Sequence, residues 1–305
     1  MMNTVIPRPP SWFKRDWLWG LILILAVILT YTPVWWAGFV WDDDINVTAN
    51  PCIVGPLGLK EIWTTTHAGY YPLVLTTVWV EHALWGLAPL PYHLVNVLLH
   101  ATCAVLLWWV LRSLRILGAW LGAALWALHP VQVESVAWIT ELKNTQSCLF
   151  YLLTIRFFLE WQNREILDQK GIERDYLLAL VFALLAILSK PSTVVLPAVL
   201  GLVWWWMGGQ WHGRLVLRLA PFFLIAAAAS IWAIVEQKFH AGAVGSEWAQ
   251  TWAERLVIAG KIVWFYLGKL VWPHPLIFIY PRWEIDASHL VAYLPMTAVV
   301  LEVIS

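Results

Sequence analysis

The sequence predicts an all-α protein that crosses a membrane several times. Hydrophobic residues make up 61% of the 305 positions and charged residues 12%, and the mean hydropathy is +0.68. A soluble domain has roughly 45–50% apolar and about 25% charged residues. Many of the 25 Trp residues lie near the ends of apolar runs, as expected for amphipathic rings at the level of the lipid headgroups.

The charge balance argues against a nucleic-acid partner. The formal net charge is zero and the basic residues are scattered along the chain, whereas nucleic-acid-binding domains gather them on one surface. The three cysteines, Cys52, Cys103 and Cys148, lack the spacing of a metal site. The apolar composition instead predicts membrane lipids as partners.

Nine apolar runs are long enough, or nearly so, to cross a bilayer, which takes about 20 residues of helix. In chain order they are residues 17–37, 92–111, 116–129, 145–161, 176–189, 191–207, 219–235, 256–272 and 289–304. Residues 70–86 are also apolar, but a span there would reverse the loops that follow. We therefore expect an interfacial or re-entrant helix at that place, and about 8–10 transmembrane helices with amphipathic helices on the outer face.

Basic residues give the orientation. With the amino terminus in the cytoplasm, the inward ends of the runs collect eleven Lys and Arg residues and the outward ends collect five through Arg255. This asymmetry matches the positive-inside bias of membrane proteins. It places the first long loop and the charged segments described below on one extracytoplasmic side.

One transmembrane domain is expected over residues 1–305. It consists of the first span at 17–37, a first extracytoplasmic loop with interfacial helices at 38–91, and the remaining spans at 92–305. The chain stops inside an apolar run, so we expect the domain to be incomplete at its carboxy terminus. No 34-residue helical period, the sign of tetratricopeptide repeats, appears in the sequence.

The segment FVWDDDINVTANP places Asp42, Asp43 and Asp44 directly after the first span. Carboxylates beside like charges and an apolar wall hold a proton more tightly, which suits a general base. The alternative is that one aspartate caps the helix that follows and that the others are solvated. The position at the mouth of a span, before a long outer loop, favours the functional interpretation.

The segment HPVQVESVAWITELKN begins at His129, and its proline predicts a helix start. Glu134, Trp138 and Glu141 recur at helical spacing and so predict one face of a helix, with Lys143 at the far end. Two carboxylates and an ammonium group beside a bilayer suggest a binding site. An ordinary polar face of a surface helix is the alternative.

Lys190 lies in the sequence SKP between two apolar runs, and Pro191 explains the break because the residue before proline leaves the α region. Snorkelling from a helix end is the default role of such a lysine. Lys190 and Lys143 nonetheless share the predicted side of the aspartates, and ammonium groups bind phosphate. A base on one wall and cations on another suggest transfer from a phosphate-linked donor.

Four segments, FVWDDDINVTANP, HPVQVESVAWITELKN, LSKPSTVVLPAVL and YLGKLVWPHPLIFIYP, occur in this order. They resemble the membrane half of the transmembrane and tetratricopeptide-repeat protein O-mannosyltransferases and their bacterial relatives, which are GT-C glycosyltransferases. The resemblance covers about residues 17–285. It implies a GT-C helical bundle in a bacterial inner membrane, with a cytoplasmic amino terminus and an active site facing the periplasm or exterior.

The resemblance also implies an inverting enzyme that moves mannose or another hexose from a polyprenyl phosphate to a hydroxyl of a protein or lipid acceptor, with Ser or Thr of a protein expected. It assigns catalysis to Asp42 and Asp43, donor phosphate binding to Lys190, Lys143 and His129, and sugar or cation binding to Asp44, Glu134 and Glu141. Leu142 stands where relatives usually have arginine before the lysine. This departure weakens the case for a full phosphate-binding pair at Lys143.

Three questions stay open at the level of the sequence. Hard carboxylate oxygens suit Mg²⁺ or Mn²⁺, so a divalent metal at the aspartates is an option. A transporter or flippase for an anionic lipid-linked substrate is the alternative function, and an inactive scaffold is another. Transporters typically place ionisable groups near the midplane and often carry inverted repeats; here the charges gather at one predicted face, which favours the enzyme.

Overall fold

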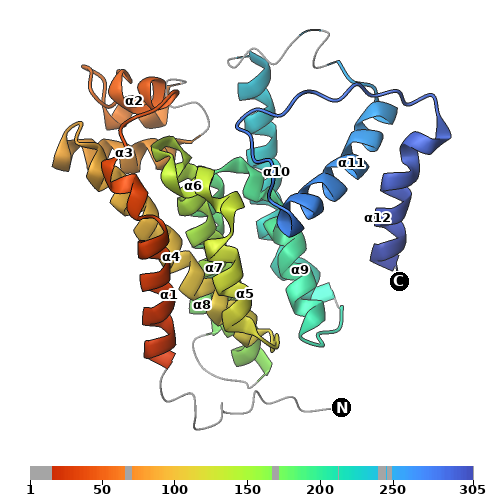
Figure 1. The fold of residues 1–305 in the computed structure, drawn as a ribbon. Coiled ribbons are helices and arrows are strands. Elements are labelled where there is room, and N and C mark those ends of the chain that lie inside the picture. Colours follow the sequence, from red (N-terminus) through yellow and green to blue (C-terminus); the bar gives the residue numbers. More distant parts are fainter. Residues whose placement is uncertain are drawn as a thin grey trace. The chain divides into compact units, whose positions relative to one another are not determined.

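The computed structural model describes residues 16–65, 71–166, 172–211, 213–239, 245 and 249–304, and within these ranges the chain is helical with no strand. The all-α prediction is therefore confirmed (Figure 1). The chain divides into two compact units, residues 1–128 with 134–233, and residues 129–133 with 234–305.

The first unit holds most of the helices. In chain order they are α1 (Asp16–Thr30), α2 (Leu59–Thr64), α3 (Pro72–Trp85), α4 (Pro89–Ser113), α5 (Ala119–Leu128), α6 (Val133–Ala137), α7 (Leu142–Ile166), α8 (Ile172–Ser189), α9 (Leu196–Trp206) and the first part of α10 (Gly213–Phe239). Proline stands at the start of α3 and α4, where its missing N–H costs no hydrogen bond.

Every apolar run that the sequence analysis identified overlaps a helix, including the expected interfacial helix at α3. Among the described residues, two helices are long and apolar enough to cross a membrane, α4 and α10, while α1 and α5 are shorter apolar helices. The prediction of about 8–10 transmembrane helices therefore goes beyond what the helix lengths establish.

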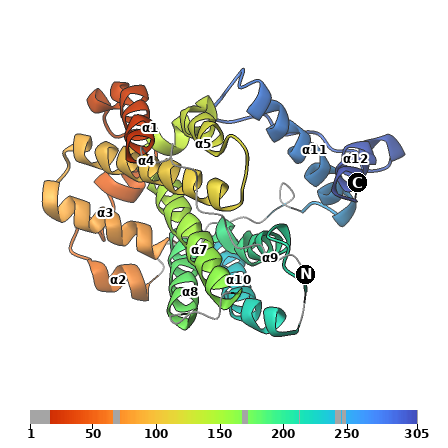
Figure 2. The ribbon, with the colours of Figure 1, turned by 90° about the horizontal axis from the view of Figure 1, so that it is seen from below.

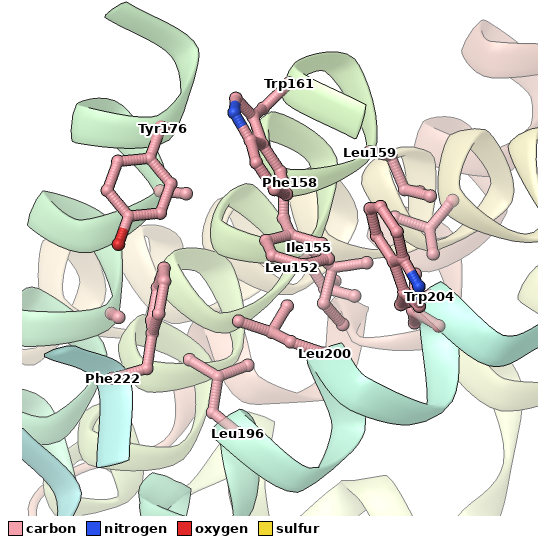
Figure 3. Packing of buried hydrophobic residues seen from close by; sticks show 14 of the residues in the cluster. Leu152, Ile155, Phe158, Leu159, Trp161, Tyr176, Leu196, Leu200, Trp204 and Phe222 are labelled. Atoms are coloured by element: carbon pink, nitrogen blue, oxygen red, sulfur yellow. The ribbon is translucent and has the colours of Figure 1, made fainter. Parts of the chain in front are cut away.

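The largest core of the first unit forms where α7 and α8 pack against α4, α9 and α10. Phe158 and Trp161 of α7 are fully buried, with ring centroids 5.2 Å apart, and Phe222 of α10 meets Phe158 at 6.3 Å in an edge-to-face arrangement. Figure 3 shows Leu196 and Leu200 of α9 beside these rings. Burial of these large apolar side chains stabilises the packing of the helices on one another.

A second core joins α1, α4 and α5, which lie together in both views (Figures 1 and 2). The α5 side of this core is built from Ala123 and Ala127, which are fully buried against Leu23 and Val27 of α1 and neighbouring residues of α4. Small side chains let helices approach closely. The end of α1, from which the aspartate segment emerges, is therefore held against α4 and α5.

The loop after α1 has a core of its own. Val47, Cys52 and Ile62 pack with Val74 and Val78 of α3, and the Trp63 indole donates a hydrogen bond of 2.9 Å to the Thr76 hydroxyl. In Figure 1, α2, α3 and α6 lie at the end of this unit where α1 finishes. The loop is thus a packed structure and not a solvated linker.

The second unit contains α11 (Trp252–Val271), the short helix η9 (Leu290–Tyr293) and α12 (Leu294–Ile304). Thr251 and Glu254 form a capping box at the start of α11. At Gly260 a side chain would lie 2.5 Å from the Met296 backbone nitrogen. The glycine therefore permits the close packing of α11 on α12.

Glu81 of α3 is buried, with 4% exposure, and its Oε1 atom has no hydrogen-bond partner. The side chain of Glu81 therefore lies in the protein interior. Burial raises the pKa of Glu81 to about 8. The folded protein therefore favours the neutral carboxyl group.

We predict that replacing Glu81→Gln changes the pH dependence of stability. Because the folded pKa of Glu81 is raised, its stabilising contribution is complete below the unfolded pKa and is lost as the pH rises through about 8. Thermal unfolding in detergent between about pH 5 and pH 9 should show the wild type losing stability relative to the variant. Glu284→Gln, at an exposed site, controls for the loss of one carboxylate. A difference in thermal stability between wild type and variant that stays constant across this pH range would contradict the prediction.

Candidate active site

The carboxylate of Asp43 is fully buried, and both of its oxygens accept hydrogen bonds from the protein. Its Oδ2 accepts from the Val40 backbone N–H at 2.8 Å, and its Oδ1 accepts from the Thr140 N–H at 2.9 Å and the Thr140 hydroxyl at 2.6 Å. The two bonds to Thr140 join segments 97 residues apart. Asp43 is therefore the anchor that attaches the turn after α1 to the segment before α7.

Asp42 and Asp44 occupy different environments. Asp42 is half-buried, and its Oδ1 atom is buried without a hydrogen-bond partner. Asp44 is exposed, begins the π-helical turn η3 (Asp44–Thr48), and accepts a hydrogen bond of 2.8 Å from the Thr48 hydroxyl. Of the three carboxylates, Asp42 is the one with a buried oxygen that the surrounding protein does not satisfy.

The prediction of one continuous helical face from Glu134 to Glu141 is wrong. The helix α6 ends at Ala137, Trp138 is extended at φ −92° and ψ 126°, and a 3₁₀ turn, η6 (Ile139–Glu141), leads into α7. The break has a physical cause, because the Thr140 backbone N–H bonds to Asp43. A helix through this point would direct that N–H to a carbonyl four residues earlier.

Trp138 is held at the break from two directions. Its indole Nε1 donates to the Val40 carbonyl at 3.3 Å, and its own carbonyl accepts at 3.1 Å from the side-chain amide of Asn96 in α4. The indole also stacks on Trp41, with ring centroids 5.7 Å apart and an interplanar angle of 7°. The break is therefore fixed by long-range contacts and not by local sequence.

A charged cluster follows directly from this break. Lys143 Nζ pairs with Glu141 Oε1 at 2.7 Å, and both side chains are largely buried. The Asn144 amide donates to the other oxygen of Glu141 and to Ser135. Lys190, between α8 and η7 (Pro191–Val195), donates to Asn144 Oδ1. The structure thus brings Glu141, Lys143 and Lys190 into one network.

The electrostatics of the cluster include Glu134. Burial raises the pKa of Glu134, and the Glu141 carboxylate adds to this effect, while Lys190 and Lys143 oppose it. Burial lowers the pKa of Lys190, and the carboxylates of Glu141 and Glu134 oppose that shift while Lys143 adds to it. Two carboxylates and two ammonium groups therefore interact at close range in a partly desolvated region.

His129 belongs to the second unit. Its Nδ1 accepts a hydrogen bond of 3.2 Å from the Val131 N–H, and its Nε2 lies 3.0 Å from the Leu270 carbonyl oxygen. An accepting Nδ1 places the proton on Nε2, which donates to Leu270. The predicted role of His129 in phosphate binding stays a prediction.

His93 is a candidate that the sequence analysis missed. It is 1% exposed in α4, and neither ring nitrogen meets a hydrogen-bond partner at good geometry. The ring lies near the carbonyls of Ala37, Gly38 and Ala137 and interacts electrostatically with Asp43. Its signal in the sequence is a polar residue inside an apolar helix, one turn before another at Asn96.

The described residues contain no group of three His, Cys, Asp or Glu side chains arranged to hold a metal ion. Asp43 is occupied by three protein donors. The divalent metal therefore stays a prediction.

Comparison with known proteins gives a consistent set of relatives. The chain is 30% identical over 179 residues to the Protein O-mannosyl-transferase Tmtc1 of Drosophila melanogaster, which covers 54% of this chain and 20% of the relative. It is 31% identical over 137 residues to the Protein O-mannosyl-transferase TMTC2 of Mus musculus, covering 41% and 16%. This chain is a distant homologue of such proteins. It spans about a fifth of the length of these O-mannosyl-transferases.

No family model matches the chain, and no solved structure matches it. The named relatives agree with the resemblance that the four sequence segments show. The GT-C superfamily and a bacterial origin rest on that resemblance alone.

We predict that Asp43→Asn destabilises the fold. An asparagine amide cannot accept from both sides, so its NH₂ group would face the Val40 N–H or the Thr140 donors. The free energy of unfolding should fall by about 1–3 kcal/mol. Chemical unfolding of the purified protein in detergent measures this difference. Asp44→Asn, at the exposed neighbour, should change stability by less than about 0.5 kcal/mol. Equal effects of the two variants would contradict the anchoring role.

Proposed function

We propose that the chain is the membrane part of a GT-C glycosyltransferase that moves mannose or another hexose from a polyprenyl phosphate to a Ser or Thr hydroxyl of a protein. The observation that supports it most is the buried, unpartnered oxygen of Asp42, which lies on a turn anchored by Asp43 to the segment carrying Glu141 and Lys143. The relatives named protein O-mannosyl-transferases support the same chemistry.

In the proposed reaction Asp42 acts as the general base. The acceptor hydroxyl oxygen attacks C1 of the sugar, its proton passes to the Asp42 carboxylate, and the bond from C1 to the phosphate oxygen breaks. A single displacement of this kind inverts the anomeric centre. Asp43 holds the turn in place and takes no part in proton transfer, because its oxygens already accept three hydrogen bonds.

The leaving polyprenyl phosphate needs fixed positive charge more than a proton. Lys190 and Lys143 supply it in this proposal, since preorganised cations stabilise the charge that develops on a departing group. Glu141 and Asn144 orient the two ammonium groups before the donor arrives. Glu134 and Asp44 remain candidates for sugar hydroxyls, and His129 for the phosphate.

The proposal places this chemistry at the extracytoplasmic face of a bacterial inner membrane, with a cytoplasmic amino terminus. The apolar helices α4 and α10 support membrane insertion. A long lipid tail would lie between apolar helices while its phosphate meets the cluster at the membrane face. The acceptor would then approach from the aqueous side.

Asp42→Asn should abolish most of the transfer without affecting folding. The buried Oδ1 atom of Asp42 has no protein partner to lose, and removal of a general base typically lowers the rate by about 10²–10⁴-fold. The measurement is transfer of labelled mannose from a polyprenyl phosphate to a peptide, with thermal unfolding in parallel. Asp286→Asn, an exposed aspartate of the second unit, serves as a control.

Full transfer by the Asp42→Asn variant would show that the base is another group. If the wild-type protein instead accumulates the lipid-linked substrate inside sealed vesicles and transfers no sugar to the peptide, the transporter is favoured over the enzyme.

Lys190→Gln should weaken donor binding, because glutamine keeps a hydrogen-bond donor toward Asn144 but removes the charge. We expect the KM for the donor to rise by about 10–100-fold, as for loss of a charged hydrogen bond. Steady-state transfer at varied donor concentration measures this change. Lys60→Gln on α2, an exposed lysine, is the matched control. An unchanged KM would remove Lys190 from the phosphate site.

A further inference from the structure

Trp41 has a backbone conformation that its side chain does not favour. Its φ angle is +50°, in the left-handed region, which is uncommon for residues with a Cβ and a genuine outlier for bulky ones. The Asp43 N–H bonds to the Val40 carbonyl at 3.0 Å, so Trp41 is the second residue of a tight turn. In turns with positive φ at this position, glycine or asparagine is the usual residue.

The other described non-glycine residue with positive φ has an ordinary explanation. Arg115, at φ +60°, follows the last turn of α4, where its N–H bonds to Arg112 and the Ile116 N–H bonds to Leu111. This is the common left-handed end of a helix. Trp41 follows no such helix end, and strain retained without a capping role is a feature of ligand sites.

The indole of Trp41 is held but accessible. It stacks in parallel on Trp138, whose own ring is fixed by the Val40 carbonyl. Trp138 is 9% exposed, whereas Trp41 is 60% exposed. Lys143 Nζ lies 6.0 Å from the centroid of the Trp138 ring. The turn therefore presents a rigid aromatic surface next to the charged cluster.

The chemistry around this surface suits a carbohydrate. The face of an aromatic ring is electronegative and attracts polarised C–H bonds, and one side of a hexose is lined by such bonds. The hydroxyls of a hexose need carboxylate or amide partners, and Asp42 is the next residue in the chain. A lipid tail would use the aromatic surface but not the carboxylates.

We infer that Trp41 is a sugar-binding residue that stacks on the hexose moiety of the lipid-linked donor and positions its C1 atom for attack. This inference rests on the proposed function and adds the sugar contact to it. The strained turn is what directs the indole and the Asp42 carboxylate toward the same bound sugar.

The test compares two soluble probes, a mannosyl phosphate with a short prenyl chain and the same prenyl phosphate without the sugar. Calorimetry on the full chain in detergent gives the dissociation constant of each. In the wild type the sugar should strengthen binding, and in Trp41→Leu this advantage should shrink by about 3–10-fold. Binding of the sugarless probe should stay within about 2-fold, and Trp41→Phe should keep most of the advantage.

Trp36→Leu is the matched control, since Trp36 is 83% exposed on the short helix η2 (Thr32–Trp36) and belongs to no part of the site. Thermal unfolding checks that each variant is folded. An unchanged sugar advantage in Trp41→Leu would overturn the inference. An equal loss in Trp36→Leu would also overturn it, because both tryptophans would then act as membrane anchors.

The transfer assay is run separately on the same proteins. If the wild type binds the mannosyl probe through Trp41 but transfers no sugar to peptide, the sugar-binding role of Trp41 stands and the proposed function fails. If transfer proceeds and Trp41→Leu leaves the sugar advantage unchanged, the proposed function stands and the inference fails.

Discussion

The bond between the Asp43 carboxylate and Thr140 is the constraint on which the arrangement of the site depends. It is a buried charge in an apolar protein, and such a charge is strongly unfavourable unless donors surround it. Val40 supplies one donor from the same turn, and Thr140 supplies two from a segment 97 residues further along the chain. Apolar packing alone would tolerate several registers between the loop and α7, whereas a carboxylate with three donors permits one.

The consequences of this register extend through the first unit. Because Thr140 is committed to Asp43, the chain cannot continue α6, and it restarts as α7 two residues later. That restart orients Glu141, Lys143 and Asn144 toward Lys190 at the end of α8. Trp138, at the break itself, becomes the support for Trp41. A single long-range contact thus organises the acidic turn, the aromatic pair and the cations together.

The sequence predicts the helices well because apolar runs of helical length require internally bonded backbone in a membrane. The run at residues 92–111, for example, forms α4 over Pro89–Ser113. The grouping of the Asp43 turn with Glu141, Lys143 and Lys190 follows from the same alternation of spans. The orientation stays a prediction, and Arg8, Lys14 and Arg15, which are among the eleven basic residues that support it, lie outside the described part of the chain.

Details that depend on distant partners could not be predicted. Helical spacing from Glu134 to Glu141 predicts a continuous helical face. No residue near Thr140 indicates that its N–H donates to the carboxylate of Asp43 far upstream. The different roles of the three aspartates could not be predicted either, because three identical residues in a row do not indicate which side chain is buried. His93 could have been noticed as a polar residue in an apolar helix, but its neighbours come from two other segments.

The pairing of the cations also bears on selectivity among anions. Lys143 already has a carboxylate partner and Lys190 an amide partner, so an incoming anion must replace those contacts. The free energy of binding is then only the difference between the new contacts and the ones that are lost. Chloride or inorganic phosphate brings no further contacts to offset the exchange. A donor with a lipid tail and a sugar does, and on the proposed function the cluster would therefore reject small ions while accepting the lipid-linked phosphate.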